Sequence, residues 1–126
     1  MANKDGDSSW GRPIWKSMHI FAACVDEQNV REFFDYLHLL PKLIPCKKCG
    51  GHFAQLLKMF PPESQITNKH DAVLYTYFLQ DQVNISINRE KTKPLKKSPN
   101  FEDFKTELFA SLETHCKECK LVMQTL

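Results

Sequence analysis

The sequence lacks an excess of charge of either sign and a cysteine content high enough for a disulfide-stapled mini-protein. Its 17 Lys and Arg residues are balanced by 15 Asp and Glu residues, so the net charge is +2 and we expect no nucleic-acid partner. Five Cys in 126 residues stay below the roughly 8–10% that marks a disulfide scaffold. The 42% hydrophobic and 11% aromatic content excludes an intrinsically disordered chain. One globular domain is the expected organisation.

The sequence also lacks a segment that resembles a targeting signal or a membrane span. Residues 1–9 are polar, so we expect no signal peptide there and a disordered N-terminal tail instead. The longest apolar stretch, Leu37–Ile44, is interrupted by Pro41 and Lys42, and it is far shorter than the roughly 18 residues of a spanning helix. We therefore expect a soluble, cytoplasmic protein without a membrane partner.

Strand-like alternation, hairpin dipeptides and internal repeats are absent as well, and apolar residues instead recur at helical spacing. Asn29 is expected to cap a second helix, and Pro41 to kink or end it. Thr67 or Asn68 is expected to cap a fourth helix, and a loop is expected over Asn88–Asn100. The pattern predicts an all-α fold, a four-helix bundle with a fifth helix. The expected helices cover about residues 12–25, 30–44, 46–60, 68–87 and 101–112.

What stands out is two CxxC pairs, Cys46/Cys49 and Cys116/Cys119, with Cys24 left over. A reducing cytosol disfavours passive structural disulfides and leaves metal binding or redox chemistry. Four thiolates are a zinc ligand set, but Cys49 and Cys116 are 67 positions apart, against roughly 12–20 in small zinc ribbons. A zinc-binding helical interaction module using both pairs remains the alternative interpretation. Cys24 is expected to be a buried cysteine that packs as a small apolar residue.

A redox-active dithiol is the other interpretation of Cys46 and Cys49. Two cysteines at positions i and i+3 in the first turn of a helix can form an easily reduced disulfide, and the helix N-terminus favours the thiolate. Positive charge from Lys42, Lys47 and Lys48 acts in the same direction. Because the sequence has no βαβ unit of the thioredoxin type, we expect a cofactor to supply the oxidising power.

Two motifs stand ahead of and at the first cysteine pair. They read Trp10-Gly-Arg-Pro-Ile-Trp15-Lys-Ser-Met-His19 and, later in the chain, Pro45-Cys46-Lys-Lys-Cys49. In this combination the chain resembles the Erv/ALR family of FAD-linked sulfhydryl oxidases. The likeness covers about residues 10–104 and includes the segment 78–88. In size the chain is similar to the short single-domain members of large DNA viruses, which would place it in a host cytoplasm or a virion.

The resemblance implies a four-helix bundle with a short fifth helix, FAD at the mouth of the bundle and a homodimer. Residues 10–112 would form the FAD-binding sulfhydryl oxidase domain. The implied activity is the formation of disulfide bonds in protein dithiols, with electrons passing through the CxxC pair to FAD and then to O2, giving H2O2. In this family the second CxxC cysteine lies against the flavin and the first exchanges with the substrate. These roles fall on Cys49 and Cys46, with no metal ligand implied.

The resemblance also implies which residues surround the cofactor. Trp15 and His19 would contact the flavin and adenine regions, and Val83 and Asn84 the adenine and ribose side. Arg12, together with a basic residue after Asn84 such as Arg89 or Lys91, would meet the pyrophosphate. The full expected set is Gly11, Arg12, Trp15, His19, Phe78, Gln80, Val83, Asn84, Arg89 and Lys91.

Three positions depart from the family pattern. Gln80 stands where His is usual, and an amide forms hydrogen bonds but does not titrate. Cys24 stands where an aromatic residue is common. Phe101 and Phe104 are the nearest counterparts of the Trp that many members carry in the fifth helix.

The second pair, Cys116/Cys119, lies in a C-terminal segment formed by residues 113–126. Enzymes of this family often carry a second dicysteine on a mobile segment that relays electrons from the substrate. Such a relay requires attack of a thiolate on the sulfur of Cys46. We expect this segment to be a shuttle, and a structural disulfide that fixes the tail is the alternative.

Overall fold

The described residues, 10–90 and 97–115 of a computed structural model, are helical with connecting turns and contain no strand. This confirms the predicted all-α class. The helices are α1 (Gly11–Ala23), α2 (Val30–Leu43), α3 (Lys47–Met59), α4 (Pro62–Gln65), α5 (Lys69–Glu90) and α6 (Phe101–His115). None of these helices combines the length and the apolar character needed to cross a membrane.

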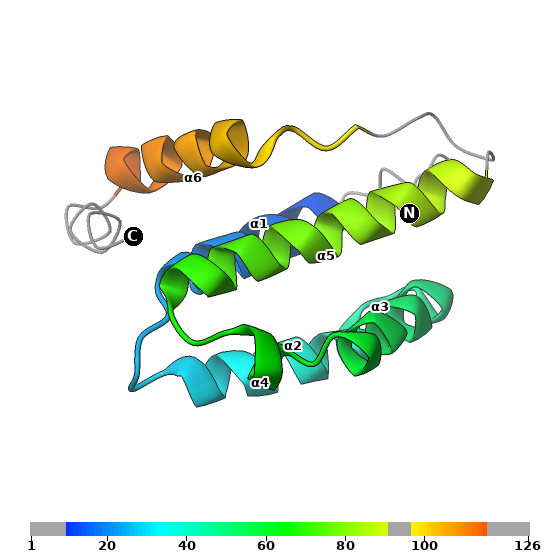
Figure 1. Cartoon of the computed structure of the whole chain (residues 1–126). Helices are drawn as coiled ribbons and strands as arrows, with labels where there is room; N and C mark the ends of the chain where they lie inside the picture. Colours follow the sequence, from blue (N-terminus) through cyan, green and yellow to red (C-terminus); the bar gives the residue numbers. More distant parts are fainter. Residues whose placement is uncertain (1–9, 91–96, 116–126) are drawn as a thin grey trace.

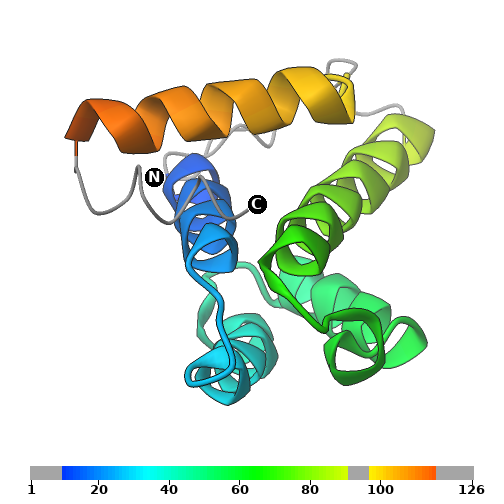
Figure 2. The same ribbon diagram turned by 60° about the vertical axis from the view of Figure 1, so that its left-hand side comes forward.

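Four long helices form the bundle, and a fifth lies across one side of it (Figures 1 and 2). Helix α1 packs mainly against α5, and α2 packs mainly against α3. Helix α6 contacts both α1 and α5 and lies away from α2 and α3 in the two views. With 15 residues, α6 is longer than α1 and α3, so the fifth helix is not short. The only very short helix among the described residues is α4, a single turn that the sequence analysis did not predict.

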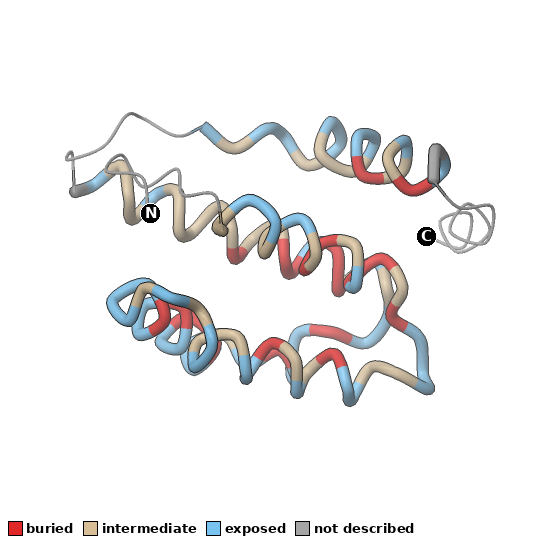
Figure 3. Tube along the Cα trace, turned by 180° about the vertical axis from the view of Figure 1, so that it is seen from behind, coloured by how far each residue is buried: buried red, intermediate tan, exposed pale blue. Residues whose placement is uncertain are grey.

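The core lies where the bundle helices face one another, as the buried segments in Figure 3 show. Met18, Leu37 and Leu79 come from three different helices, and each side chain is at most 1% exposed. Full burial of one such side chain contributes about 1.5–3 kcal/mol. Leu108 and Leu112, one turn apart on α6, are also buried, so α6 is part of the core rather than an appendage.

The ends of α2 differ from the prediction. Asn29 precedes the helix but does not cap it with its side chain. Its Oδ1 accepts from the Asp26 N–H (2.8 Å) and its Nδ2 donates to the Cys24 carbonyl (2.9 Å), so it stabilises the preceding turn. Pro41 stays inside the helix, in its last turn. The helix ends two residues later because Ile44, which precedes a proline, is extended (ψ 146°).

The start of α5 confirms its predicted cap, and α6 starts at its predicted position. The Asp71 N–H donates to Asn68 Oδ1 (2.8 Å) at the start of α5. Helix α6 begins at Phe101, as expected. The predicted loop over residues 88–100 is partly wrong, because α5 continues to Glu90. No proline or glycine interrupts residues 88–90, and nothing else in them stops a helix.

Candidate active site

The first cysteine pair lies at the N-terminus of α3 and forms a disulfide. Cys46 is the N-cap, Cys49 lies in the first turn, and their Cα atoms are 5.2 Å apart. The Cys49 N–H donates to Cys46 Sγ (3.1 Å), so the sulfur accepts from a helix N–H group that has no intrahelical partner. The placement at a helix start was predicted. The positive end of the helix dipole stabilises a thiolate at this position once the disulfide is reduced.

Gly50, directly after the pair, is a point of close approach between α3 and α2. A Cβ atom at Gly50 would overlap the carbonyl oxygen of Pro41 and lie 3.6 Å from Ile44 Cγ1. That carbonyl has no helical partner four residues later, because Pro45 has no N–H. At Gly51, by contrast, a Cβ atom would meet nothing within 4 Å. The contact between Gly50 and Pro41 therefore fixes the first turn of α3 against α2, next to the disulfide.

An aromatic cluster connects α1, α3 and α6 close to the disulfide. Trp15 stacks on His19 with 6.1 Å between ring centroids, and it contacts Phe53 at 6.0 Å. Phe104 packs edge-on against His19 at 4.6 Å. Phe53 follows Cys49 by four residues, so the two lie on the same face of α3, one turn apart. The cluster of Trp15, His19, Phe53 and Phe104 thus lies on the Cys49 side of the helix.

His19 lies at the centre of this cluster and ties α1 to α5. Its side chain is 6% exposed. Nε2 forms a hydrogen bond with Gln80 Oε1 (2.7 Å), and Nδ1 forms one with Thr76 Oγ1 (2.9 Å). Burial lowers the pKa of His19, and the hydrogen bond with Gln80 opposes that shift only in part. The ring is therefore neutral near pH 7, with one nitrogen donating and the other accepting.

The remaining expected cofactor residues are spread along α1 and α5. Phe78 is half-buried, and its ring packs edge-on against Phe60 with 4.9 Å between ring centroids. This contact does not connect Phe78 to the aromatic cluster around His19. Val83 and Asn84 are half-buried, and Asn84 Nδ2 donates to Ser98 Oγ (3.1 Å).

The basic residues expected at the pyrophosphate lie at helix ends. Arg12 is exposed in the first turn of α1, next to the half-buried Gly11, and Arg89 is exposed in the last turn of α5. Helices α1 and α3 begin, and α5 ends, toward the same end of the bundle (Figures 1 and 3). Arg12 and Arg89 therefore lie toward the end that carries the disulfide. Lys91, Cys116 and Cys119 lie outside the described residues.

Several contacts at the site were not predicted from the sequence. Phe53 was not among the residues expected around the cofactor, although its spacing of four from Cys49 is a readable signal. Thr76, one turn before Gln80, holds the other nitrogen of His19. Ser86 Oγ lies 3.2 Å from His52 Nε2 and links α5 to the first half of α3. Among residues 10–90 and 97–115, no group of three or more His, Cys, Asp or Glu is arranged to hold a metal ion.

Comparison with known proteins decides the family. The profile described as Erv1 / Alr family matches residues 12–108, which contain the disulfide and the whole aromatic cluster. The chain belongs to the Erv1/Alr family. The resemblance based on the tryptophan, histidine and CxxC motifs is thereby confirmed.

One curated relative of this Erv1/Alr chain is the FAD-linked sulfhydryl oxidase ERV2 of Saccharomyces cerevisiae. The two are 26% identical over 84 residues, which is 64% of this chain and 42% of the yeast protein. The chain therefore spans less than half the length of that relative. No solved structure matches the chain significantly.

Proposed function

We propose that the chain is a FAD-dependent sulfhydryl oxidase that forms disulfide bonds in protein dithiols and passes the electrons to O2, giving H2O2. The observation that carries the proposal is the Cys46–Cys49 disulfide at the start of α3, one helical turn from the aromatic cluster. Membership of the Erv1/Alr family supports it, and so does the similarity to the yeast relative, which is named as a FAD-linked sulfhydryl oxidase.

The residues at this end of the bundle suit FAD by their chemistry. Trp15 and Phe104 are half-buried and offer flat aromatic faces for the ring systems of the cofactor, whereas Phe53 is buried and packs against Trp15. Arg12 and Arg89 supply positive charge for a pyrophosphate. When bound, FAD would accept the electron pair from the reduced cysteines and deliver it to O2. Gln80 would act through the hydrogen bond that orients the neutral ring of His19.

The cysteine pair performs the exchange with the substrate. A substrate thiolate attacks Cys46 Sγ, which forms a mixed disulfide and releases Cys49 as a thiolate. The second substrate thiolate then attacks the substrate sulfur of the mixed disulfide, and Cys46 leaves as a thiolate. The substrate loses two electrons, the cysteine pair gains them, and the two thiol protons pass to solvent. Cys49 is assigned to the cofactor side because it shares a helix face with Phe53, which contacts Trp15.

Cys116 and Cys119 are proposed to relay electrons from a protein substrate to Cys46. Cys116→Ser is then expected to leave the oxidation of dithiothreitol unchanged, because this small dithiol reaches Cys46 directly. Oxidation of a reduced protein is expected to slow by tenfold or more. Oxygen consumption and H2O2 release, measured with both substrates, test the oxidase activity and the relay together. Equal loss with both substrates would make the terminal pair structural, and Cys24→Ser serves as the cysteine control.

Homodimerisation belongs to the same proposal. Phe21, Leu39 and Leu43 lie on α1 and α2 with between 49% and 72% of each side chain exposed, and exposed apolar groups of this kind are suited to a subunit interface. The similarity in size to short viral members, and with it the cytoplasmic or virion location, stays a prediction.

A further inference from the structure

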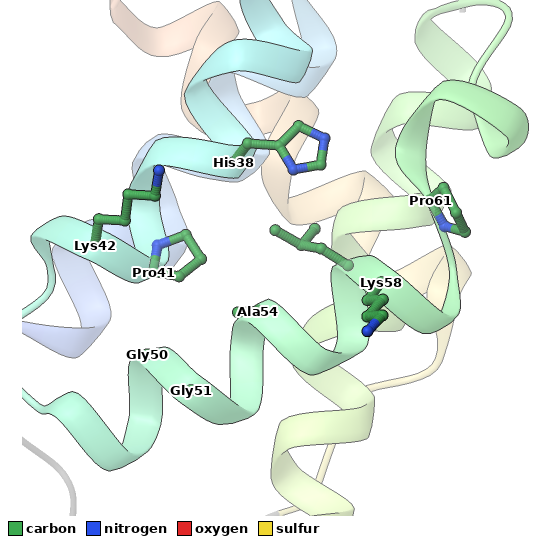
Figure 4. A pocket seen from close by; sticks show the side chains of 9 residues that line it. His38, Pro41, Lys42, Gly50, Gly51, Ala54, Lys58 and Pro61 are labelled. Atoms are coloured by element: carbon green, nitrogen blue, oxygen red, sulfur yellow. The ribbon is translucent and has the colours of Figure 1, made fainter.

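A groove runs between the C-terminal half of α2 and the length of α3 (Figure 4). Its volume is about 560 Å³. The floor is formed largely by small and apolar side chains, among them Pro41, Ala54 and Leu57. His38 and Lys42 extend from α2 on one wall, and Lys58 extends from α3 on the other.

One end of the groove adjoins the redox pair. Gly50, which lines the groove, directly follows Cys49 and is held against Pro41. From Gly50 to Lys58 the axis of α3 rises by about 12 Å, at 1.5 Å per residue. That length accommodates about four residues of an extended peptide. A peptide seated in the groove therefore has its next residues within reach of the disulfide.

The groove is basic. Lys42 and Lys58 line it, no Asp or Glu is among its lining residues, and neither lysine pairs with a carboxylate of the described residues. Lys47 is exposed in the adjoining first turn of α3. One carboxylate contacts the lining, because Glu63 Oε2 lies 2.8 Å from Nε2 of the lining residue His38.

We propose that this groove binds an acidic segment of a peptide dithiol substrate that reaches Cys46 without the Cys116/Cys119 relay, flanking the cysteines that are oxidised. The proposal rests on the proposed oxidase function and deepens it by naming a substrate class. Two lysines on opposite walls recognise Asp or Glu side chains, while the small and apolar floor accepts the peptide backbone. The chain's own C-terminal segment, residues 113–126, is a poor occupant because Lys117 and Lys120 balance Glu113 and Glu118, so the segment carries no net negative charge.

The direct test uses redox-inert peptides, so that binding is measured without turnover. A fluorescein-labelled peptide with Ser at both cysteine positions and flanking Asp and Glu residues is compared with its Asn and Gln counterpart by fluorescence anisotropy at low salt. We expect the acidic peptide to bind at least tenfold more tightly. We expect Lys42→Glu with Lys58→Glu to reduce its affinity to that of the neutral peptide. The matched control is Lys16→Glu with Arg31→Glu, two exposed cations outside the groove whose reversal changes the net charge equally.

Equal affinity for the acidic and neutral peptides would overturn the proposal. So would an equal loss of affinity in the groove variant and the control variant, because that outcome reports only net charge. The milder pair Lys42→Gln and Lys58→Gln gives the same test if the reversed variant does not fold. With cysteine-containing peptides, Lys58→Glu alone, which leaves the positive charge of Lys42 in place, should raise KM for the acidic substrate and leave kcat and the dithiothreitol rate unchanged. Absence of turnover despite selective anisotropy would refute the oxidase function but not the groove.

Discussion

Cys49→Ser is expected to reduce the oxidation of dithiothreitol to the background rate. Without the Cys49 sulfur there is no Cys46–Cys49 disulfide for a substrate thiolate to attack, so no electron pair passes from the substrate to the cofactor side of the site. The fold should survive, because Cys49 lies in the exposed first turn of α3 and its backbone N–H stays available to Cys46 Sγ. The measurement is oxygen consumption with dithiothreitol as the substrate.

The controls for this prediction separate chemistry from folding. Cys24→Ser changes a half-buried cysteine at the end of α1, and it should keep the full rate. Circular dichroism of Cys49→Ser should show the same helix content as the parent chain. A Cys49→Ser rate within tenfold of the parent rate would contradict the role assigned to this cysteine.

Gly50→Ala is expected to have the largest effect on stability of any substitution next to the disulfide. The added methyl group meets the carbonyl oxygen of Pro41, a backbone atom that moves only if α2 or α3 shifts. Overpacking of this kind costs about 1–3 kcal/mol. Gly51→Ala is the matched control, because the space around Gly51 is open and alanine favours a helix by about 0.5–1 kcal/mol over glycine.

Both variants gain the same helix propensity, so urea denaturation should separate their free energies of unfolding by the overpacking cost alone, about 1–3 kcal/mol. Because Gly50 adjoins Cys49, Gly50→Ala should also change the rate at which dithiothreitol reduces the Cys46–Cys49 disulfide, and Gly51→Ala should not. Equal free energies of unfolding for the two variants would contradict the close packing of α2 against α3 at Gly50.

Local sequence signals predicted the features that depend on local chemistry. Asn68 caps α5 as expected, because an amide oxygen at that position reaches a free N–H group one turn later. The start of α3 at the CxxC pair was predicted from the same logic. Asn29 has the same type of side chain but hydrogen-bonds backward into its turn. Both arrangements are compatible with the sequence, so the residue type alone does not select one of them.

Contacts between residues that are far apart in the chain could not be predicted from local patterns in the sequence. The resemblance placed His19 and Gln80 at one site, and the structure joins them by a hydrogen bond. Neither spacing nor residue type predicted that Thr76 would hold the other nitrogen of His19. The approach of Gly50 to Pro41 likewise depends on how two helices cross, which periodicity along one helix does not encode.

The measurement that tests the central claim most directly is the visible absorption spectrum of the purified protein, combined with analysis of what is released on denaturation. The account predicts a yellow protein with flavin absorption bands, one FAD released per chain, and bleaching of those bands by dithiothreitol in the absence of O2. A colourless protein that releases no FAD and contains one zinc ion per chain would contradict it and select the zinc-binding helical module instead.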